Sequence, residues 1–346
     1  MSGGEHRRPT SFDVAERAGV SQSTVSRALA GSPVIAEPTR NRVLKAAEEL
    51  GYFVDERAAR LRRGSTGALA VVVICRPGES ASSINPFAYA LLGSVCLAAS
   101  ERGFETLVSF QAAEDRLFGH YQERGWADGL VVIGTTTNQP AWDYFRGIEA
   151  SGRKVVYWGS PFDELEWIRS DNHAAGRLAV EHLLKAGYRR PCFLGALDTP
   201  QVQFTERYEG YASAMRNAGL EPCLVATVNA PSREEEGRRA ARRLVERADD
   251  VDAIFAACDA MALGAMEALA SADIAVPQDM GVIGFDDLLA GRFSRPPLTT
   301  IGPDPAEAGA ALVEAVLGGE DARSRAEGGR RVPVTLIARA STARSG

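Results

Sequence analysis

The chain has 346 residues, of which 45% are hydrophobic and 24% charged, and these values exclude wholesale disorder, collagen-like repeats and coiled-coil rods. Its net charge of −6 is unevenly distributed: residues 1–63 hold 11 basic and 8 acidic side chains, whereas residues 64–346 hold 28 and 37. A basic head on an acidic body indicates that only the head binds a polyanion.

Neither a membrane segment nor a metal site is expected. The longest uninterrupted apolar stretch spans residues 68–75, far short of the roughly 20 residues that cross a bilayer. The first residues contain two arginines but no apolar segment behind them, so we expect no secretory signal, a cytoplasmic protein and no membrane partner. The five cysteines include no CxxC pair and the four histidines have no HxxxH or HxH spacing. We therefore expect reduced cysteines, no metal and no cofactor.

In chain order, residues 10–51 show helical patterns only, residues 55–67 form a short charged stretch, and β-branched runs then alternate with helical patterns. Strands are predicted at 69–74, 106–110, 129–133, 154–158, 192–195, 224–228, 253–257 and 281–285, and helices at 89–102, 174–186, 207–218, 234–247 and 260–271. This alternation predicts an α/β fold with parallel sheets covered by helices. The roughly eight β-α units fit two doubly wound subdomains better than one eightfold barrel. The number of units alone would also allow the barrel.

The head has the pattern of a helix-turn-helix. Thr10 and Asp13 match a capping box, and Gly19 can adopt the left-handed conformation that ends a first helix. Ser21 can cap a second helix whose Val25 points inward, and a third helix is expected at about 39–50. The polar face of the second helix suits base edges and phosphates; it consists of Gln22, Ser23, Ser26 and Arg27. The alternative is an unspecialised helical hairpin with polar caps.

At this point the segments DVAERAGVSQSTVSRAL (13–29) and PTRNRVLKAAEELGY (38–52) resemble the LacI/GalR family of bacterial transcription regulators. The likeness continues in RAARLRRG (57–64), NPF (85–87), SDN (170–172), RLAVEHLLKAGYRR (177–190), ERYEGY (206–211), DAMALGAMEAL (259–269), GVIGFDD (281–287) and PPLTTI (296–301). It implies a three-helix DNA-binding domain and a periplasmic-binding-protein-like effector domain of two doubly wound subdomains. It also implies a homodimeric repressor that binds a palindromic operator in double-stranded DNA and responds to a small effector.

The expected domain limits follow from the resemblance and the composition. We expect the DNA-binding domain at 1–54, a hinge helix or linker at 55–66, and the effector-binding and dimerisation domain at 67–346. Within the effector-binding domain, the N-subdomain is expected at about 67–168 and 303–330, and the C-subdomain at about 169–302 and 331–346. The chain ends in VPVTLIARASTARSG (332–346), which predicts a strand followed by a polar tail. No leucine heptad follows this strand, so we expect a dimer and not a coiled-coil tetramer.

The hinge segment RAARL (57–61) is too short to be a stable helix alone. The resemblance implies that it folds on DNA and that Leu61 wedges between base pairs in the minor groove. The alternative is a solvated basic linker. The residues expected to contact DNA are Thr10, Ser11, Ser21, Gln22, Ser23, Thr24, Ser26, Arg27, Arg57, Ala58, Arg60 and Leu61. Ala36 stands where the family often has a serine, which removes a polar cap before the third helix.

Effector contacts are expected at the carboxyl ends of the predicted strands, where ligands bind in open α/β folds. The resemblance makes Arg207 and Asp286 polar anchors, and Phe87 and Trp158 aromatic walls. Phe87 could instead be plain core, and Asp171 and Asp259 could instead be helix N-caps. The full candidate set is Asn85, Phe87, Trp158, Asp171, Arg207, Asp259 and Asp286. Cys258 replaces an asparagine that is common in the family, so the pocket is expected to lack one amide.

No catalytic motif competes with this interpretation, because GxSxG, P-loop and strand-following GxGxxG patterns are all missing. Two alternatives remain open: a cytoplasmic doubly wound enzyme, or a sugar-binding protein without a regulatory role. A donor fork and an acceptor pair favour a mono- or disaccharide, although stacked aromatic rings would also suit a nucleobase. A phosphate-rich ligand would need several cations, and none is seen in sequence beside Arg207 or Asp286.

Overall fold

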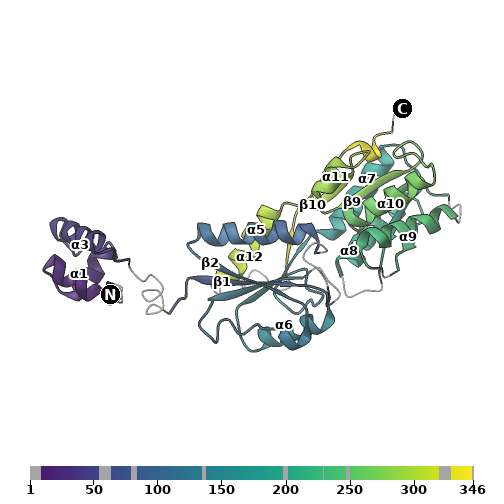
Figure 1. Ribbon diagram of the computed structural model, residues 1–346. Helices are drawn as coiled ribbons and strands as arrows, with labels where there is room; N and C mark the ends of the chain where they lie inside the picture. The colour runs from purple at the N-terminus through teal and green to yellow at the C-terminus, as the bar shows by residue number, and fades with distance from the viewer. Residues whose placement is uncertain are drawn as a thin grey trace, which may run out of the picture. The chain divides into compact units, whose positions relative to one another are not determined.

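The computed structural model describes residues 9–53, 64–78, 84–134, 138–197, 202–228, 230–246, 250–318 and 329–344 (Figure 1). It divides into two compact units, Met1–Thr66 and Gly67–Gly346. The predicted hinge residues Arg57, Ala58, Arg60 and Leu61 lie outside the described residues.

The first unit contains three helices that share one small core. They are α1 (Ser11–Ala18), α2 (Gln22–Leu29) and α3 (Glu37–Leu50). Val14, Val25 and Val43 contribute one fully buried side chain from each helix, as the inward-facing pattern predicted. A core this small holds the helices in place and leaves the polar side of α2 to solvent.

The predicted helix ends are confirmed. Thr10 and Asp13 form a reciprocal capping box, in which the Thr10 amide donates to the Asp13 carboxylate at 2.7 Å. Gly19 ends α1 with φ +64°, and the Ser21 hydroxyl accepts a hydrogen bond from the Thr24 amide at the start of α2. Ala36 precedes α3 without any side-chain cap, as its missing hydroxyl predicted.

The second unit contains two six-stranded sheets, which confirms the doubly wound prediction and excludes the single barrel. The first sheet has the order β11-β5-β4-β3-β1-β2 with every pair parallel. Its strands are β1 (Ala68–Ile74), β2 (Glu105–Gln111), β3 (Gly129–Gly134), β4 (Val155–Trp158), β5 (Trp167–Ser170) and β11 (Arg330–Val332).

The second sheet has the order β12-β10-β9-β8-β6-β7, and only the edge strand β12 is antiparallel to its neighbour. Its strands are β6 (Pro191–Gly195), β7 (Leu224–Ala226), β8 (Ala253–Ala256), β9 (Gly281–Phe285), β10 (Thr299–Pro303) and β12 (Val334–Ile337). We call the two sheets, each with its own helices, the first and the second subdomain.

Helices cover the sheets as the β-α alternation requires. In the first subdomain they are α5 (Pro86–Glu101), α6 (Gln139–Ala150) and α12 (Pro305–Leu317), with the 3-10 turn η2 (Glu114–Arg116). Helices α5 and α12 cover one face of the sheet and α6 the other (Figure 1). Alternate residues of β1 face these two sides: Leu69 and Val71 pack with α5 and α12, whereas Ala70 and Val72 pack with α6. This two-sided burial explains why β1 is a continuous apolar run.

The second subdomain contains two closely packed helix pairs, α7 with α8 and α9 with α10. The bounds are α7 (Asn172–Lys185), α8 (Val202–Asn217), α9 (Arg233–Glu246), α10 (Asp259–Ser271), α11 (Leu289–Phe293) and the 3-10 turn η3 (Ala340–Thr342). A β-carbon at Gly176 of α7 or Gly210 of α8 would collide with the backbone of the other helix. These glycines therefore let the two backbones touch, and they fix where α8 presents its side chains.

The chain crosses between the two sheets three times: after β5, after β10, and between β11 and β12. Of the twelve strands in the described residues, the strand pattern predicted eight by position, together with a strand in the C-terminal segment that corresponds to β12. It did not predict β5, β10 or β11, and α6, α11 and α12 are not among the helices named from sequence. The sequence of β5, WIRS, contains a buried arginine in place of a β-branched run, so its strand character comes from its neighbours.

The expectation of five reduced cysteines is wrong for one pair. Cys192 and Cys223 form a disulfide with their Cα atoms 4.7 Å apart, while Cys75, Cys96 and Cys258 are free thiols. Strands β6 and β7 are hydrogen-bonded neighbours, and the Phe193 amide donates to the Cys223 carbonyl at 3.0 Å. This pairing brings together two cysteines 31 positions apart. Among the described residues, no helix has the length and apolar character needed to cross a membrane.

Candidate functional site

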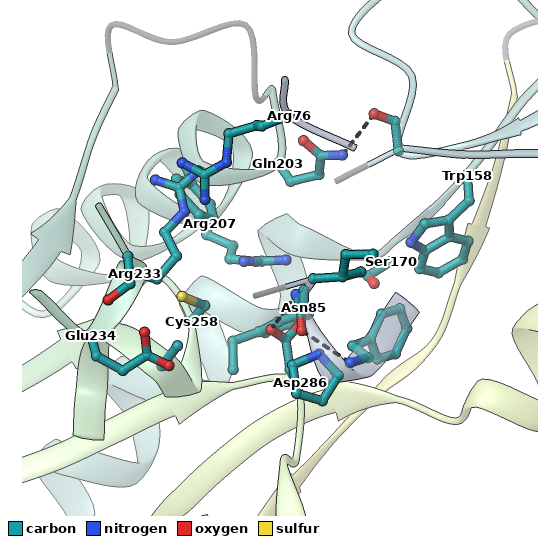
Figure 2. Close-up of a pocket in the computed structure, with 18 of the residues that line it drawn as sticks. Arg76, Asn85, Trp158, Ser170, Gln203, Arg207, Arg233, Glu234, Cys258 and Asp286 are labelled. Carbon is teal, nitrogen blue, oxygen red and sulfur yellow. Dashed lines mark hydrogen bonds between the residues drawn. The ribbon is translucent and has the colours of Figure 1, made fainter. Parts of the chain in front are cut away.

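A cavity of about 310 Å³ lies where the carboxyl ends of strands from both sheets meet (Figure 2). The first subdomain lines it with Arg76, Ile84, Asn85, Pro86, Phe87, Trp158, Gly159, Arg169 and Ser170. The second contributes Gln203, Phe204, Arg207, Pro231, Ser232, Arg233, Glu234, Cys258, Ala260, Phe285 and Asp286. The volume corresponds to about ten water molecules, which is close to the roughly twelve non-hydrogen atoms of a hexose. Five of the seven predicted effector residues therefore line one cavity.

Arg207 was predicted to open its helix, but α8 begins five residues earlier at Val202, so Arg207 lies in the second turn, and its side chain is buried. Its Nε donates to Asn172 Oδ1 at 2.9 Å and its Nη1 donates to the carbonyl of Ala257. The guanidinium carbon lies 3.5 Å from the centre of the Phe285 ring. Burial lowers the pKa of Arg207, and the nearby Asp286 opposes that effect. The side chain is thus a rigidly held buried cation with donor capacity left at Nη2.

Asp286 directly follows β9 and has a φ of +117°, a left-handed conformation that is strained for any residue other than glycine. Its Oδ2 accepts a hydrogen bond from Asn85 Nδ2 at 3.3 Å, and this bond joins the second subdomain to the first. Burial raises the pKa of the carboxyl to about 6, while Arg207 and the Asn85 hydrogen bond keep it from rising further. A strained, desolvated carboxylate aimed into a cavity is typical of a ligand-binding position.

Phe87 and Trp158, the aromatic walls that the resemblance implies, lie side by side, with ring centres 5.6 Å apart and planes tilted by 33°. Both side chains line the cavity, and both also belong to the buried core of the first subdomain. Figure 2 shows Trp158 at the cavity. The Asn85 side chain caps α5 by accepting a hydrogen bond from the Phe87 amide at 3.0 Å, which fixes the entry of this helix beside the cavity. The apolar face of a ring-shaped ligand could stack here while its polar edge faces Arg207 and Asp286.

Asp171 and Asp259 do not line the cavity. Asp171 is the N-cap of α7 and accepts a hydrogen bond from the Ala174 amide at 3.0 Å, in agreement with the alternative weighed above. Asp259 is fully buried, but the helix-cap interpretation is wrong for it, because Cys258 occupies the N-cap position of α10. The Asp259 carboxylate instead accepts hydrogen bonds from the Thr300 hydroxyl at 2.6 Å and the Leu288 amide at 2.7 Å. Burial raises its pKa to about 7.

Cys258 brings a thiol to the cavity where the family often has an amide. Burial raises the pKa of this thiol to about 12, and the Asp286 carboxylate acts in the same direction, so the group stays neutral at physiological pH. A neutral thiol is a weak hydrogen-bonding group, so this part of the wall recognises a ligand mainly by shape.

The expectation that cations are missing around the site is wrong, since four arginines line the cavity. Arg76 lies two residues after the end of β1, a position that the carboxyl-end rule could have identified. Arg169 and Arg233 were not predicted, and buried carboxylates offset both of them. Arg169 bonds to Glu206 at 3.3 Å and Arg233 bonds to Glu236 at 2.6 Å. The arginines therefore act chiefly as oriented hydrogen-bond donors and not as an excess of positive charge.

The helix-turn-helix unit presents a short polar face on α2. Ser23, Ser26 and Arg27 are exposed, and Gln22 donates a hydrogen bond to the Ser11 hydroxyl at 3.2 Å. This hydrogen bond links the start of α2 to the start of α1. Ser21 and Thr24 are engaged in the cap of α2, with their hydroxyl oxygens 2.9 Å apart. Among the described residues, no group of three or more histidine, cysteine, aspartate or glutamate side chains could hold a metal ion.

A helix-turn-helix unit followed by two doubly wound sheets with a cavity at their junction defines a DNA-binding regulator with a small-molecule site. Residues 12–54 match the family described as bacterial regulatory proteins, lacI family, and residues 180–342 match a periplasmic binding protein-like domain. The chain belongs to the lacI family of bacterial transcriptional regulators, and it is not an enzyme.

Several characterised proteins are similar over most of their length. The HTH-type transcriptional regulator CelR of Thermobifida fusca is 32% identical over 85% of this chain and 87% of its own. The ribose operon repressor of Escherichia coli strain K12 is 31% identical over 89% of this chain and 92% of its own. The solved complex of CelR with cellobiose has a TM-score of 0.67 at 28% identity, covering 96% of this chain and all of that one. A lac repressor dimer bound to operator has a TM-score of 0.77 at 24% identity and shares the fold, over 97% and 99% of the two chains.

Proposed function

We propose that this protein is a cytoplasmic, homodimeric repressor whose affinity for a palindromic DNA operator changes when a mono- or disaccharide occupies the cavity. The observation that carries the proposal is the composition of that cavity. A buried guanidinium from Arg207 and a strained carboxylate from Asp286 face an aromatic wall of Phe87 and Trp158.

This arrangement suits the chemistry of a sugar. Vicinal hydroxyls can accept hydrogen bonds from Arg207 and donate them to Asp286, whereas the apolar face of a pyranose ring stacks on an indole. The carboxylates beside Arg169 and Arg233 offset the charge that a phosphate-rich ligand would need. Two relatives support the same ligand class, because CelR has been solved with cellobiose and another is named as a ribose operon repressor.

The DNA-binding part of the proposal rests on the helix-turn-helix unit. Residues 1–54 would bind the major groove through α2, and residues 55–66 would serve as the hinge between DNA and the effector domain at 67–346. The direct contacts would come from Gln22, Ser23, Ser26 and Arg27, with Thr10, Ser11, Ser21 and Thr24 placing the helix on the phosphates. The hinge contacts are proposed from sequence alone and comprise Arg57, Ala58, Arg60 and Leu61.

The test combines two measurements on the full-length protein. Mobility shift with DNA selected from a random pool should yield a palindromic site, and the complex should migrate as one dimer per site. Thermal shift followed by calorimetry should identify a binding sugar in a panel of cellobiose, ribose, glucose, xylose and the nucleoside cytidine. Binding of cytidine alone would contradict the sugar assignment, and the absence of a sequence-specific complex would contradict the DNA-binding role.

A further inference from the structure

A buried carboxylate joins the two subdomains beside the cavity without lining it. Glu206 lies on α8 of the second subdomain, and only 5% of it is exposed. Two guanidinium groups of the first subdomain donate to its Oε1: Arg169 of β5 at 3.3 Å and Arg331 of β11 at 3.0 Å. One carboxylate oxygen of the second subdomain is therefore shared by two cations of the first.

The other oxygen of Glu206 leads to the cavity through one side chain. Asn172 is fully buried at the start of α7, and its Nδ2 donates to Glu206 Oε2 at 2.6 Å. Its Oδ1 accepts a hydrogen bond from Arg207 Nε at 2.9 Å. Both bonds require a single orientation of the amide, because only Nδ2 can donate and only Oδ1 can accept. The contact between the backbones of α7 and α8 at Gly176 and Gly210 holds the three side chains in place.

These contacts form a continuous chain from the cavity to the opposite subdomain. It runs from Arg207, which faces the ligand space, through Asn172 and Glu206 to Arg169 and Arg331. Two further hydrogen bonds across the cleft differ in kind, because both partners of each line the cavity and would exchange partners with a ligand: Asn85 with Asp286, and Gln203 with the Gly159 carbonyl. Of the groups that meet at Glu206, Arg169 lines the cavity, whereas Glu206 and Arg331 do not. The contacts of Glu206 can persist while the cavity fills, so they can transmit a change in the position of Arg207.

We propose that Glu206 is a positioning residue that couples occupancy of the cavity to the relative placement of the two subdomains, acting through Asn172 on Arg207 and through Arg169 and Arg331 on the first sheet. This inference rests on the proposed function. A ligand that engages Arg207 shifts the Asn172 amide, and the buried carboxylate passes that shift to the arginines, because a buried ion pair tolerates little change in geometry. Coupling of this kind requires two arrangements of the subdomains, and Glu206 is the group through which a shift of Arg207 would reach the first sheet.

The test uses Arg331→Gln and Glu206→Gln in the full-length protein, with cellobiose as probe and ribose as second probe if cellobiose leaves the wild type unchanged. The readout is the ratio of operator Kd with and without saturating sugar, measured beside the sugar Kd and the melting temperature. Effector coupling in allosteric proteins is typically about 5- to 150-fold. We expect Arg331→Gln to reduce this ratio of operator Kd values by at least about 5-fold relative to the wild type. If the wild-type ratio is itself smaller than about 5, the ratio in the variant should fall to about 1. The sugar Kd should stay within about 3-fold, because the cavity contacts remain.

Matched controls lie beside both positions. Arg330→Gln removes a cation from the same strand, where it pairs with the exposed Glu314 at 2.9 Å. Glu209→Gln removes an exposed carboxylate from the same helix. Both controls should respond to sugar as the wild type does. If Glu206→Gln does not fold, Arg331→Gln still carries the test, because 37% of the Arg331 side chain is exposed and a glutamine there is tolerable.

The outcomes separate this inference from the function on which it rests. An Arg331→Gln protein with a lower melting temperature and an unchanged operator ratio would show a purely structural role and overturn the proposal. A sugar Kd weakened more than about tenfold with an unchanged ratio would also overturn it, since Glu206 would then serve ligand binding alone. If no sugar in the panel changes operator binding by the wild type, the proposed function fails first and this inference fails with it.

Discussion

Replacing Asp286 with asparagine should stabilise the effector domain while weakening sugar binding. The side chain is half-buried, and desolvation raises its pKa to about 6, above the ordinary value of 3.8, even though Arg207 and Asn85 favour the charged form. A difference of about two pKa units corresponds to about 3 kcal/mol that the fold loses by keeping this carboxylate ionised. Asparagine removes that cost and has the same backbone strain as aspartate at this φ, so we expect a gain of about 1–3 kcal/mol.

The pH dependence of this gain has a definite sign. Because the folded-state pKa is raised, the native protein holds the proton more tightly than the unfolded chain does. The stabilising effect of the protonated form is complete below about pH 4 and is lost as the pH rises through about 6. The variant and the wild type should therefore melt together near pH 4. Above pH 7 the variant should melt about 2–8 °C higher, given the size of the domain.

The effect on ligand binding is opposite. A sugar hydroxyl bonded to the Asp286 carboxylate would lose a charge-assisted hydrogen bond, which is worth about 1.5–3 kcal/mol. The sugar Kd should rise about 10- to 100-fold at pH 8. Wild-type affinity should also fall as the pH drops below about 6, because protonation removes the same charge, whereas the variant should lack that step. Calorimetry at pH 5 and pH 8 measures both effects.

The neighbouring Asp287 provides a matched control, since it also has a positive φ, +52°, but does not line the cavity. Its carboxylate pairs with Arg292 at 2.6 Å and with Arg339 at 2.5 Å. Asp287→Asn should therefore lower the melting temperature and leave the sugar Kd unchanged. The reasoning would be refuted by an Asp286→Asn protein that melts below the wild type at pH 8. Unaltered sugar binding in that variant would remove Asp286 from the site.

Three further predictions concern other parts of the chain. Arg27→Ala should abolish specific operator binding in a mobility shift and leave the melting of the effector domain unchanged; intact binding would contradict the role given to α2. Leu61→Ala should weaken the operator complex and reduce the DNA bend angle measured with permuted sites, because the base step would no longer be wedged open; an unchanged bend would exclude Leu61 as the wedge. Thiol titration of the denatured, unreduced protein should count three cysteines, and reduction should lower stability by about 3–4 kcal/mol, as expected for a closed loop of 31 residues; a count of five would exclude the disulfide.

The features that the sequence predicted well are those that local interactions determine. The capping box of Thr10 with Asp13 and the left-handed Gly19 depend on residues within a few positions of one another. Continuous apolar runs such as β1 and β9 are equally easy to predict as strands, because a strand covered on both faces must be apolar throughout. Five of the seven effector candidates also follow from a local rule, since they stand near the carboxyl ends of strands.

The features that sequence could not predict arise from contacts between distant segments. Strand β5 contains the buried Arg169, which no strand pattern would include, and Glu206 of another subdomain stabilises it. Asp259 resembles a helix cap in sequence, yet its carboxylate bonds to Thr300 at a separation of 41 residues. The Cys192–Cys223 disulfide likewise depends on the neighbouring placement of β6 and β7. In each case the side chain's role is set by a partner that spacing along the chain does not reveal.

Several unfavourable features of the second unit lie at the cavity. Asp286 is both strained and desolvated, Arg207 is a buried cation with a lowered pKa, and the thiol of Cys258 is held neutral beside them. Such groups lower the stability of the empty protein, and a ligand that hydrogen-bonds to them recovers part of that free energy. Because a ligand stabilises only the state it binds, the same groups make the position of the subdomains sensitive to a small molecule. A cavity without strained or desolvated groups would bind a sugar with little effect on the relative stability of the subdomain arrangements. In this cavity, a bound sugar stabilises one arrangement over another, and that difference in free energy can alter DNA binding.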